Sequence, residues 1–353
     1  MSADPASWAE RLAGGPPVLV TGVAGFVGFH LAKALLDADV PVAGVDNVND
    51  YYDVRLKRAR LEVLSHLDGF RLIEADLADG HATARAFADV GPAHVVHLAA
   101  QAGVRYSIEN PEAYAASNLT GFLHVLEGCR AVGAEHLVYA SSSSVYGGNG
   151  RIPFSVRHGV DHPVSLYAAT KKANELMAHS YAHLYALPCT GLRFFTVYGP
   201  WGRPDMAYFK FADAIRDGRP IQIYNNGEME RDFTYIDDVT EGVARLIPLA
   251  AAPDPAFDPK APDPGASWAP WRVFNIGNRR KEKLMDMIRL LEEAMGREAE
   301  KEYLPMQPGD VTATWADIDD LEAAVGFKPD TPLSQGLAAF ARWHDEWRAA
   351  RRS

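Results

Sequence analysis

The sequence predicts a doubly wound α/β fold, in which helices cover both faces of a parallel sheet. Short apolar runs rich in Val, Leu and Ile recur at residues 16–22, 41–47, 70–77, 93–100, 135–142 and 191–199. Stretches with helical period separate these runs, and a parallel sheet covered on both faces requires this alternation. After about residue 200 the alternation loosens, and a further strand at 272–278 and a helix at 285–296 follow a proline-rich surface loop at 251–272.

Composition and charge narrow the class of protein. The chain has 353 residues with 48% hydrophobic and 23% charged residues, as in an ordinary globular protein. Its formal charge of −11 argues against generic binding to nucleic acid or to an anionic membrane, because such proteins carry a surplus of Lys and Arg. The chain has only two cysteines. It shows no basic leader and no run of 18 apolar residues, so we expect a cytoplasmic protein.

Three glycines stand where the first strand meets the first helix. Gly22, Gly25 and Gly28 form a G-x-x-G-x-x-G turn. A turn without Cβ atoms lets the backbone approach a pyrophosphate, and the helix N-terminus offers unpaired N–H groups and partial positive charge. The turn therefore predicts dinucleotide binding.

Two aspartates follow the next two strands. Asp46 ends the second strand, where a carboxylate accepts hydrogen bonds from ribose hydroxyls and repels a 2′-phosphate, so NAD is favoured over NADP. The alternative is a turn aspartate that caps the following segment. Asp76 after the third strand is a candidate adenine contact, and a strand-end cap is nearly as good an interpretation.

A tyrosine and a lysine lie four residues apart in a helical stretch at 165–185. This spacing places Tyr167 and Lys171 on one helix face. An ammonium near a phenol stabilises phenolate, as a cationic nicotinamide ring also does, so Tyr167 is the predicted base. Four serines at 141–144 end the fifth strand about 25 residues earlier, and strand ends of a parallel sheet face the ligand crevice. We expect their hydroxyls to face the substrate rather than to form a simple turn.

These motifs together resemble the extended short-chain dehydrogenases/reductases, and among them the UDP-glucuronate 4-epimerases, which interconvert UDP-glucuronate and UDP-galacturonate. The similar stretches span about residues 18 to 280, with 307–317 beyond them. The glycine turn and the Tyr/Lys pair are typical of the whole superfamily. The stretches NDYYDVRLKRARL (49–61) and YGPWGRPDMA (198–207) indicate the uronate branch.

The resemblance implies roles for individual residues. Phe26, Val27, Leu77 and Ala99 would line the NAD site with the glycines, and Lys171 would also contact the nicotinamide ribose. Ser142 would hydrogen-bond the sugar O4 and Tyr167. The remaining substrate contacts would be made by Ser143, Ser144, Thr196, Arg203 and Arg105 near the carboxylate, Arg231 at the diphosphate and Asp310 at the uridine ribose. An arginine fork suits carboxylate and phosphate, which explains how an acidic protein attracts an anion.

The implied reaction is epimerisation at C4 through a transient 4-keto sugar, with no net redox change. A 4-keto uronate is a β-keto acid that loses CO2 readily, so a held carboxylate protects it. The runner-up is a UDP-galactose/UDP-glucose 4-epimerase, whose neutral hydroxymethyl group does not call for Arg203. Dehydratases and decarboxylases resemble this fold but carry acids where Ser143 and Ser144 stand, and a catalytically silent NAD-binding module does not need an intact Tyr167 and Lys171.

The resemblance also implies the arrangement of the chain. We expect a Rossmann-type NAD-binding domain at 1–195, to which the chain returns at about 233–278, and a smaller C-terminal α/β lobe at 196–232 and 279–345 that binds the nucleotide sugar. A homodimer is implied as well. We expect no metal site, because no Glu lies between His179 and His183 as in H-E-x-x-H. The basic cluster 55–60 is interpreted as a solvated helix face.

Overall fold

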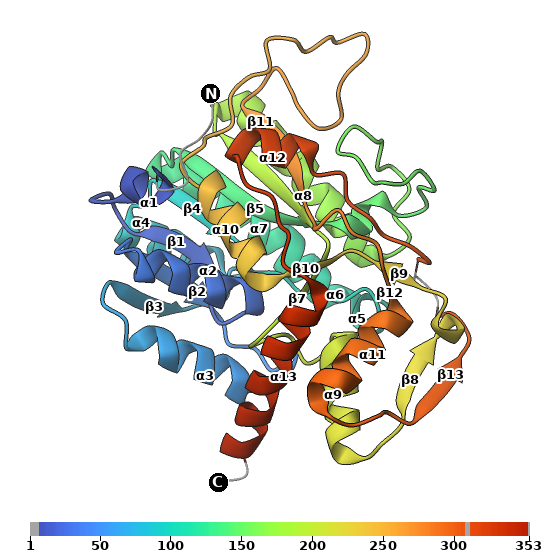
Figure 1. Ribbon diagram of the computed structural model, residues 1–353. Helices are drawn as coiled ribbons and strands as arrows, with labels where there is room; N and C mark the ends of the chain where they lie inside the picture. The colour runs from blue at the N-terminus through green and yellow to red at the C-terminus, as the bar shows by residue number, and fades with distance from the viewer. Residues whose placement is uncertain (1–6, 308–310, 352–353) are drawn as a thin grey trace.

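The computed structural model describes residues 7–307 and 311–351, and its centre is a seven-stranded parallel sheet (Figure 1). The strand order is β11-β6-β5-β4-β1-β2-β3. The bounds are β1 (Val18–Thr21), β2 (Val42–Asp46), β3 (Phe70–Glu74), β4 (His94–His97), β5 (His136–Ser142), β6 (Cys189–Phe194) and β11 (Trp271–Ile276). The predicted doubly wound α/β fold is confirmed, because each predicted apolar run contributes one strand to this sheet.

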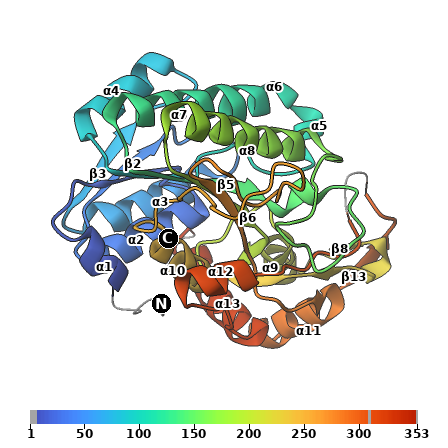
Figure 2. The same ribbon diagram turned by 90° about the horizontal axis from the view of Figure 1, so that it is seen from above.

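Helices cover both faces of the sheet (Figure 2). One face carries α4 (Gly80–Val90), α7 (Gly121–Val132) and α8 (Leu166–Tyr185), and the other carries α2 (Phe26–Asp37), α3 (Val54–Ser65) and α10 (Ile236–Leu246). The shorter elements of this part are α1 (Ser7–Leu12), α5 (Tyr106–Glu109), α6 (Pro111–Tyr114), the π-helical η1 (Ala115–Thr120), the 3-10 helix η2 (Ser143–Tyr146) and α12 (Asp319–Val325). Every residue of β1 is buried, as a central strand covered on both sides must be.

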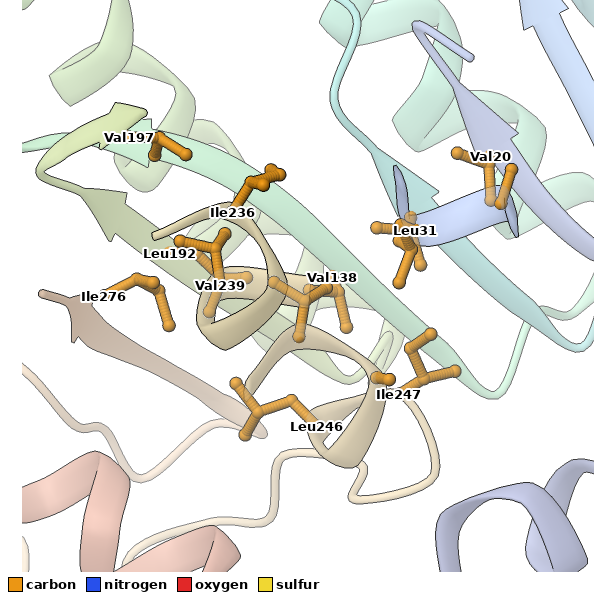
Figure 3. Packing of buried hydrophobic residues seen from close by; sticks show 14 of the residues in the cluster. Val20, Leu31, Val138, Leu192, Val197, Ile236, Val239, Leu246, Ile247 and Ile276 are labelled. Atoms are coloured by element: carbon orange, nitrogen blue, oxygen red, sulfur yellow. The ribbon is translucent and has the colours of Figure 1, made fainter. Parts of the chain in front are cut away.

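Two apolar layers hold the helices against the sheet. On the face of α2 and α10, Val20 and Val138 of the sheet pack with Leu31 and Val239 of the helices (Figure 3). Each such side chain contributes about 1.5–3 kcal/mol when it is fully buried. The opposite layer includes Ala178 of α8. This second layer fixes α8, the helix that carries Tyr167, against the sheet.

A smaller group of elements lies beside the main sheet (Figure 1). Its strands are β8 (Ile221–Tyr224) paired in parallel with β13 (Lys301–Leu304), and β9 (Glu230–Arg231) paired antiparallel with β12 (Glu282–Lys283). Its helices are α9 (Ala207–Asp217), the 3-10 helix η3 (Asn225–Gly227), α11 (Leu284–Met295) and α13 (Leu333–Ala350). The helices enclose a separate core that includes Phe209, Leu291 and Phe340. The main sheet and this group meet around β7 (Thr196–Tyr198) and β10 (Phe233–Tyr235), which pair in parallel.

The single strand expected at 191–199 is wrong, because the chain changes sheets there. β6 ends at Phe194, and the N–H group of Phe195 still donates to Ile276 of the main sheet at 3.0 Å. The N–H group of Thr196 donates instead to the carbonyl oxygen of Asp232 at 3.1 Å. Both halves are apolar, so the sequence gives no sign of the change.

The proline-rich loop is shorter than expected at its end. Trp271 and Arg272, which we placed in the loop 251–272, begin β11. The reason is burial: Trp271 is only 6% exposed and belongs to the same core layer as Tyr139 of β5. None of the described helices combines the length and the apolarity needed to cross a lipid bilayer.

Candidate active site

A pocket lies where the strand order reverses, between β1 and β4, which is where open α/β sheets bind ligands. The residues predicted to bind the cofactor all line it: Gly22, Gly25, Phe26, Val27, Gly28, Asp46, Asp76, Leu77, Ala99, Tyr167 and Lys171. Ser142 and Arg203 line the same pocket. Side chains for acid/base chemistry and an arginine are therefore adjacent to the glycine turn.

The glycine turn has no room for side chains. Gly22 has a φ of +74°, and a Cβ atom there would lie 2.6 Å from the main-chain nitrogen of Ala99. A Cβ atom on Gly28 would lie 2.2 Å from the carbonyl oxygen of Gly22. The turn thus packs against its own backbone and presents the start of α2 to the pocket. This arrangement fits the pyrophosphate of a dinucleotide.

Asp46 forms the cap that was one of its two interpretations, and it also lines the pocket. Its Oδ2 accepts a hydrogen bond from the N–H group of Ala24 at 3.0 Å, and its Oδ1 accepts one from Val48 at 2.8 Å. It therefore caps the following segment and holds the glycine turn while it lines the pocket. Asp76 accepts from the N–H group of Ala78 at 2.8 Å, so it too forms a strand-end turn beside the pocket.

The basic cluster 55–60 is only in part the solvated helix face that we expected. Arg55 and Arg58 are exposed, whereas Lys57 and Arg60 are buried. Lys57 is buried at the pocket, where its ammonium donates to Asn49 Oδ1 at 2.7 Å, and burial lowers its pKa. Arg60 is fully buried. Sequence analysis missed both residues, because charges at helical spacing look the same whether they meet water or buried oxygen atoms.

Arg60 connects two turns that are distant in the sequence. Its guanidinium donates to the carbonyl oxygen of Ala24 in the glycine turn at 2.8 Å. It also donates to the carbonyl oxygens of Trp201 at 2.5 Å and Gly202 at 3.1 Å. Trp201 has a φ of +59°, an uncommon conformation for a residue with a side chain. Arg60 therefore supports the strained turn that immediately precedes Arg203.

Tyr167 and Lys171 lie in the first two turns of α8, whose N-terminus is capped by the Ser165 side chain. Lys171 donates to the carbonyl oxygen of Ala140 at 3.0 Å, and burial lowers its pKa to about 8. Burial raises the pKa of Tyr167, while a hydrogen bond with Ser142 and the charge of Arg203 lower it. We expected a lowered pKa, but desolvation outweighs the neighbouring donors in the protein itself.

The four serines do not act as one row. Ser141 is buried at the edge of the pocket, and its hydroxyl donates to Glu175 Oε1 at 2.6 Å, so this hydroxyl is bonded within the protein. Ser142 accepts from the N–H group of Ser144 at 3.1 Å and faces Tyr167. Ser143 and Ser144 belong to η2, are partly buried and do not line the pocket. Ser142 is thus the serine that both lines the pocket and faces Tyr167.

Arg203 already binds a carboxylate. Its Nε donates to Asp205 Oδ1 at 3.0 Å and its Nη2 to Oδ2 at 2.5 Å. Tyr51 donates to the same Oδ2 at 3.3 Å. Burial raises the pKa of Asp205, but the Arg203 guanidinium holds that pKa below its ordinary value, so the pair is ionised. Sequence analysis missed Asp205 and Tyr51, although the spacing of two residues in RPD is a signal.

Of the other predicted substrate residues, Thr196, Arg105 and Arg231 lie outside the lining of this pocket. Thr196 begins β7. Arg105 is exposed at the start of α5, with its guanidinium 4.8 Å from the centre of the Tyr224 ring. Arg231 in β9 donates to two main-chain carbonyl oxygens at 2.9 and 3.2 Å. Asp310 lies outside the described residues.

No metal centre is found among residues 7–307 and 311–351, since no group of three or more His, Cys, Asp or Glu is arranged to hold an ion. The pair that we weighed, His179 and His183, packs against Trp268 of the proline-rich loop. His179 also forms a hydrogen bond with Ser267 at 2.8 Å. Both histidines therefore attach this loop to α8.

Known proteins resemble this chain over most of its length. Residues 18–256 match the NAD dependent epimerase/dehydratase family. A Rhizobium meliloti protein named probable UDP-glucuronate 4-epimerase is 51% identical over 329 residues, which cover 93% of this chain and 96% of that protein. UDP-glucuronate 4-epimerase 4 of Arabidopsis thaliana is 47% identical over 335 residues, covering 94% of this chain and 75% of that protein. The crystal structure of UDP-glucuronic acid 4-epimerase from Bacillus cereus in complex with UDP-glucuronic acid and NAD superposes with a TM-score of 0.81 at 31% identity, and covers 94% of this chain and 99% of that one.

Proposed function

Since this chain belongs to the NAD dependent epimerase/dehydratase family, we propose that it is an isomerase that inverts C4 of a UDP-uronic acid, with NAD as cofactor. The substrates are UDP-glucuronate and UDP-galacturonate. The main support is that Arg203 lines the same pocket as Tyr167, Lys171 and Ser142. A cation beside the acid/base group suits a sugar whose C6 is a carboxylate.

The protein's own groups handle the proton of the reaction. Tyr167, as phenolate, removes the proton from O4 directly or through Ser142, with which it is hydrogen-bonded. When bound, NAD+ would take hydride from C4 and return it to the opposite face of the 4-keto sugar, and its oxidised nicotinamide ring is cationic. Tyr167 then returns the proton to O4. Because burial raises the pKa of Tyr167, proton removal depends on the positive charge of Arg203 and of the bound cofactor.

Arg203 restrains the carboxylate of the sugar. The 4-keto uronate loses CO2 when its C5–C6 bond lies parallel to the carbonyl π system. A bidentate arginine fixes the plane of a carboxylate, and we assign Thr196, Ser143 and Ser144 to the same task. The 4-keto sugar keeps its carboxylate because the C5–C6 bond is held away from the orientation parallel to the carbonyl π system.

The remaining binding residues are assigned by their charge and by the resemblance of the sequence to the family. Arg231 and Arg105 are cations suited to the diphosphate and to the carboxylate side of the sugar, and Asp310 suits the uridine ribose. Asp46, buried at the pocket, suits the adenosine ribose of NAD without a 2′-phosphate. The proposed partner of the protein is this nucleotide sugar, and neither nucleic acid nor a membrane is involved.

We propose a cytoplasmic homodimer built from two lobes. Residues 1–195 with about 233–278 form the NAD-binding domain, and 196–232 with 279–345 form the nucleotide-sugar lobe. The dimer is supported by exposed apolar side chains on the outer helices, with Leu123 of α7 40% exposed and Leu176 of α8 58% exposed. Light scattering tests the dimer, and a monomeric wild-type protein at micromolar concentration would contradict it.

One experiment tests the function directly. Purified protein is incubated with UDP-glucuronate, with and without added NAD+, and the sugar is followed by proton NMR. UDP-galacturonate without a UDP-pentose is the expected product. The alternative, a UDP-galactose/UDP-glucose 4-epimerase, is favoured if UDP-glucuronate stays unchanged while UDP-galactose turns over. A UDP-pentose would show that the carboxylate is not protected.

A further inference from the structure

A fully buried ion pair lies beneath the catalytic residues. Glu175 of α8 is 1% exposed, and Arg193 of β6 is 0% exposed. Arg193 donates from Nε to Oε1 at 2.8 Å and from Nη2 to Oε2 at 2.9 Å. Buried ion pairs give little net stability compared with apolar packing, so stability alone does not explain this pair.

The pair is joined to the catalytic residues through the serines. Tyr167, Lys171 and Glu175 follow one another at intervals of four residues, so all three lie along one side of α8. Each is tied to one of three consecutive residues of β5. Lys171 donates to the carbonyl oxygen of Ala140 at 3.0 Å, Glu175 accepts from Ser141 at 2.6 Å, and Tyr167 is hydrogen-bonded with Ser142.

The same network extends across the sheet. Ser141 of β5, Arg193 of β6 and Asn275 of β11 are in register on neighbouring strands. Arg193 also donates to the Tyr146 hydroxyl of η2 at 3.1 Å, and that hydroxyl donates to Asn275 Oδ1 at 2.7 Å. The strands β5, β6 and β11 are therefore all linked to Glu175, β5 and β6 by direct hydrogen bonds and β11 through Tyr146 and Arg193.

We propose that Glu175 is a positioning residue for the epimerase reaction: held by Arg193, its carboxylate fixes Ser141, and thereby sets the placement of Tyr167 against Ser142. This inference rests on the function proposed above. Ser141 supplies a direct side-chain hydrogen bond between β5 and α8, which gives its buried hydroxyl a role. A displacement of about 1 Å between base and serine would slow the chemical step without weakening substrate binding.

The tie and the charge can be removed separately. Ser141→Ala deletes one hydrogen bond and leaves the ion pair, whereas Glu175→Gln keeps an acceptor for Ser141 and removes the charge. The charged and titratable groups that face the Glu175 carboxylate are Arg193, Lys172, Tyr139 and Tyr146. With Glu175→Gln the cation of Arg193 is left without its counter-ion.

Ser141→Ala is the deciding variant. We expect kcat for UDP-glucuronate to fall between about 10- and 100-fold, with KM within about twofold and unchanged NAD binding. Ser180→Ala is the matched control, because Ser180 lies on the exposed side of α8 and its hydroxyl donates to the carbonyl oxygen of Leu176 within the same helix. A kcat of Ser141→Ala within twofold of wild type, or a loss confined to KM, overturns the proposal.

The pH profile of kcat separates positioning from simple loss of structure. Ser141→Ala should keep the wild-type profile at lower amplitude. Glu175→Gln should move the acidic limb to lower pH, because an uncompensated buried cation favours phenolate at Tyr167. If Glu175→Gln does not fold, Ser141→Ala still decides. Wild-type protein that fails to epimerise UDP-glucuronate refutes the function itself, whereas active wild type with fully active Ser141→Ala refutes only the positioning role.

Discussion

Arg203, which lines the pocket, forms a bidentate ion pair with Asp205, and a single residue separates the two in the chain. The Nε and Nη2 atoms of Arg203 that would grip a substrate carboxylate are thus already bonded to a carboxylate of the protein. A uronate must share this guanidinium with Asp205 or take its place. A neutral sugar has no negative charge with which to share the guanidinium or to displace Asp205.

Arg203→Lys should therefore discriminate between sugars. Lysine keeps the charge but loses the planar fork, so we expect kcat/KM for UDP-glucuronate to fall about 100-fold, or about 3 kcal/mol. Any activity on UDP-galactose should change much less. Arg219→Lys is the control, because Arg219 pairs with Asp217 at the same spacing on the exposed surface. Equal losses on both sugars would contradict the carboxylate role.

Tyr167→Phe removes the proposed base and nothing else. Turnover should fall by about 100-fold or more, as for loss of a general acid/base group. Binding of NAD, measured by fluorescence titration, should be retained. Tyr181→Phe on the same helix is the control, since its hydroxyl bonds to Glu127 at the surface. Near-normal turnover of Tyr167→Phe would reject the assignment.

Gly28→Ala tests the glycine turn. The new Cβ atom would lie 2.2 Å from the carbonyl oxygen of Gly22, and backbone cannot move aside as a flexible side chain does. We expect NAD affinity to fall about tenfold or more and the melting temperature to drop. Gly242→Ala in α10 is the contrast, because nothing lies within 4 Å of its Cβ position. That substitution should leave NAD binding unchanged and should stabilise the helix by about 0.5–1 kcal/mol.

Two buried histidines should make the fold sensitive to acid. Burial lowers the pKa of His97 and of His136 from 6.5 to about 3. Below pH 6.5 the unfolded chain binds protons at these residues while the folded protein does not, so the free energy of unfolding falls as the pH falls. From pH 7 to pH 5 each histidine should account for about 2 kcal/mol of this loss. Urea unfolding at a series of pH values measures it.

The variant His136→Asn isolates one contribution. Its stability should be lower at pH 7, because His136 bonds to Ile247 and Thr190, but about 2 kcal/mol of the pH dependence should vanish. His66→Asn, at the exposed residue that follows α3, should keep the wild-type slope. Asp232 acts in the opposite direction, since burial raises its pKa to about 6 and its contribution is lost as pH rises through that value. An unaltered slope in His136→Asn would contradict the assignment.

The sheet was predictable from sequence because its strands are buried on both faces. A strand such as β1, with every residue buried, must be a continuous apolar run, and the glycine turn must follow it. The residues that we propose to contact the cofactor were placed in the pocket for a related reason, because they lie at the ends of these strands or in the first turns of α2 and α8.

Long-range pairing was not predictable. Arg60 finds its partners in carbonyl oxygens of residues 24, 201 and 202, and no local pattern marks a carbonyl as a partner. The contact of Ser141 with Glu175 depends on how α8 sits on β5, which only the folded chain determines. The change of sheet between Phe194 and Thr196 was missed because both strands are equally apolar.

That change of sheet has a consequence for recombination and engineering. The chain leaves the main sheet after β6, returns with α10 and β11, and leaves again to form β12, α11 and β13. The smaller group of elements is therefore not a cassette that one crossover could replace. A chimaera with the sugar preference of another enzyme would have to exchange two separate segments together, and keep Arg60 matched to the turn at 201–202. Stepwise substitution within the pocket is the easier route to a new specificity.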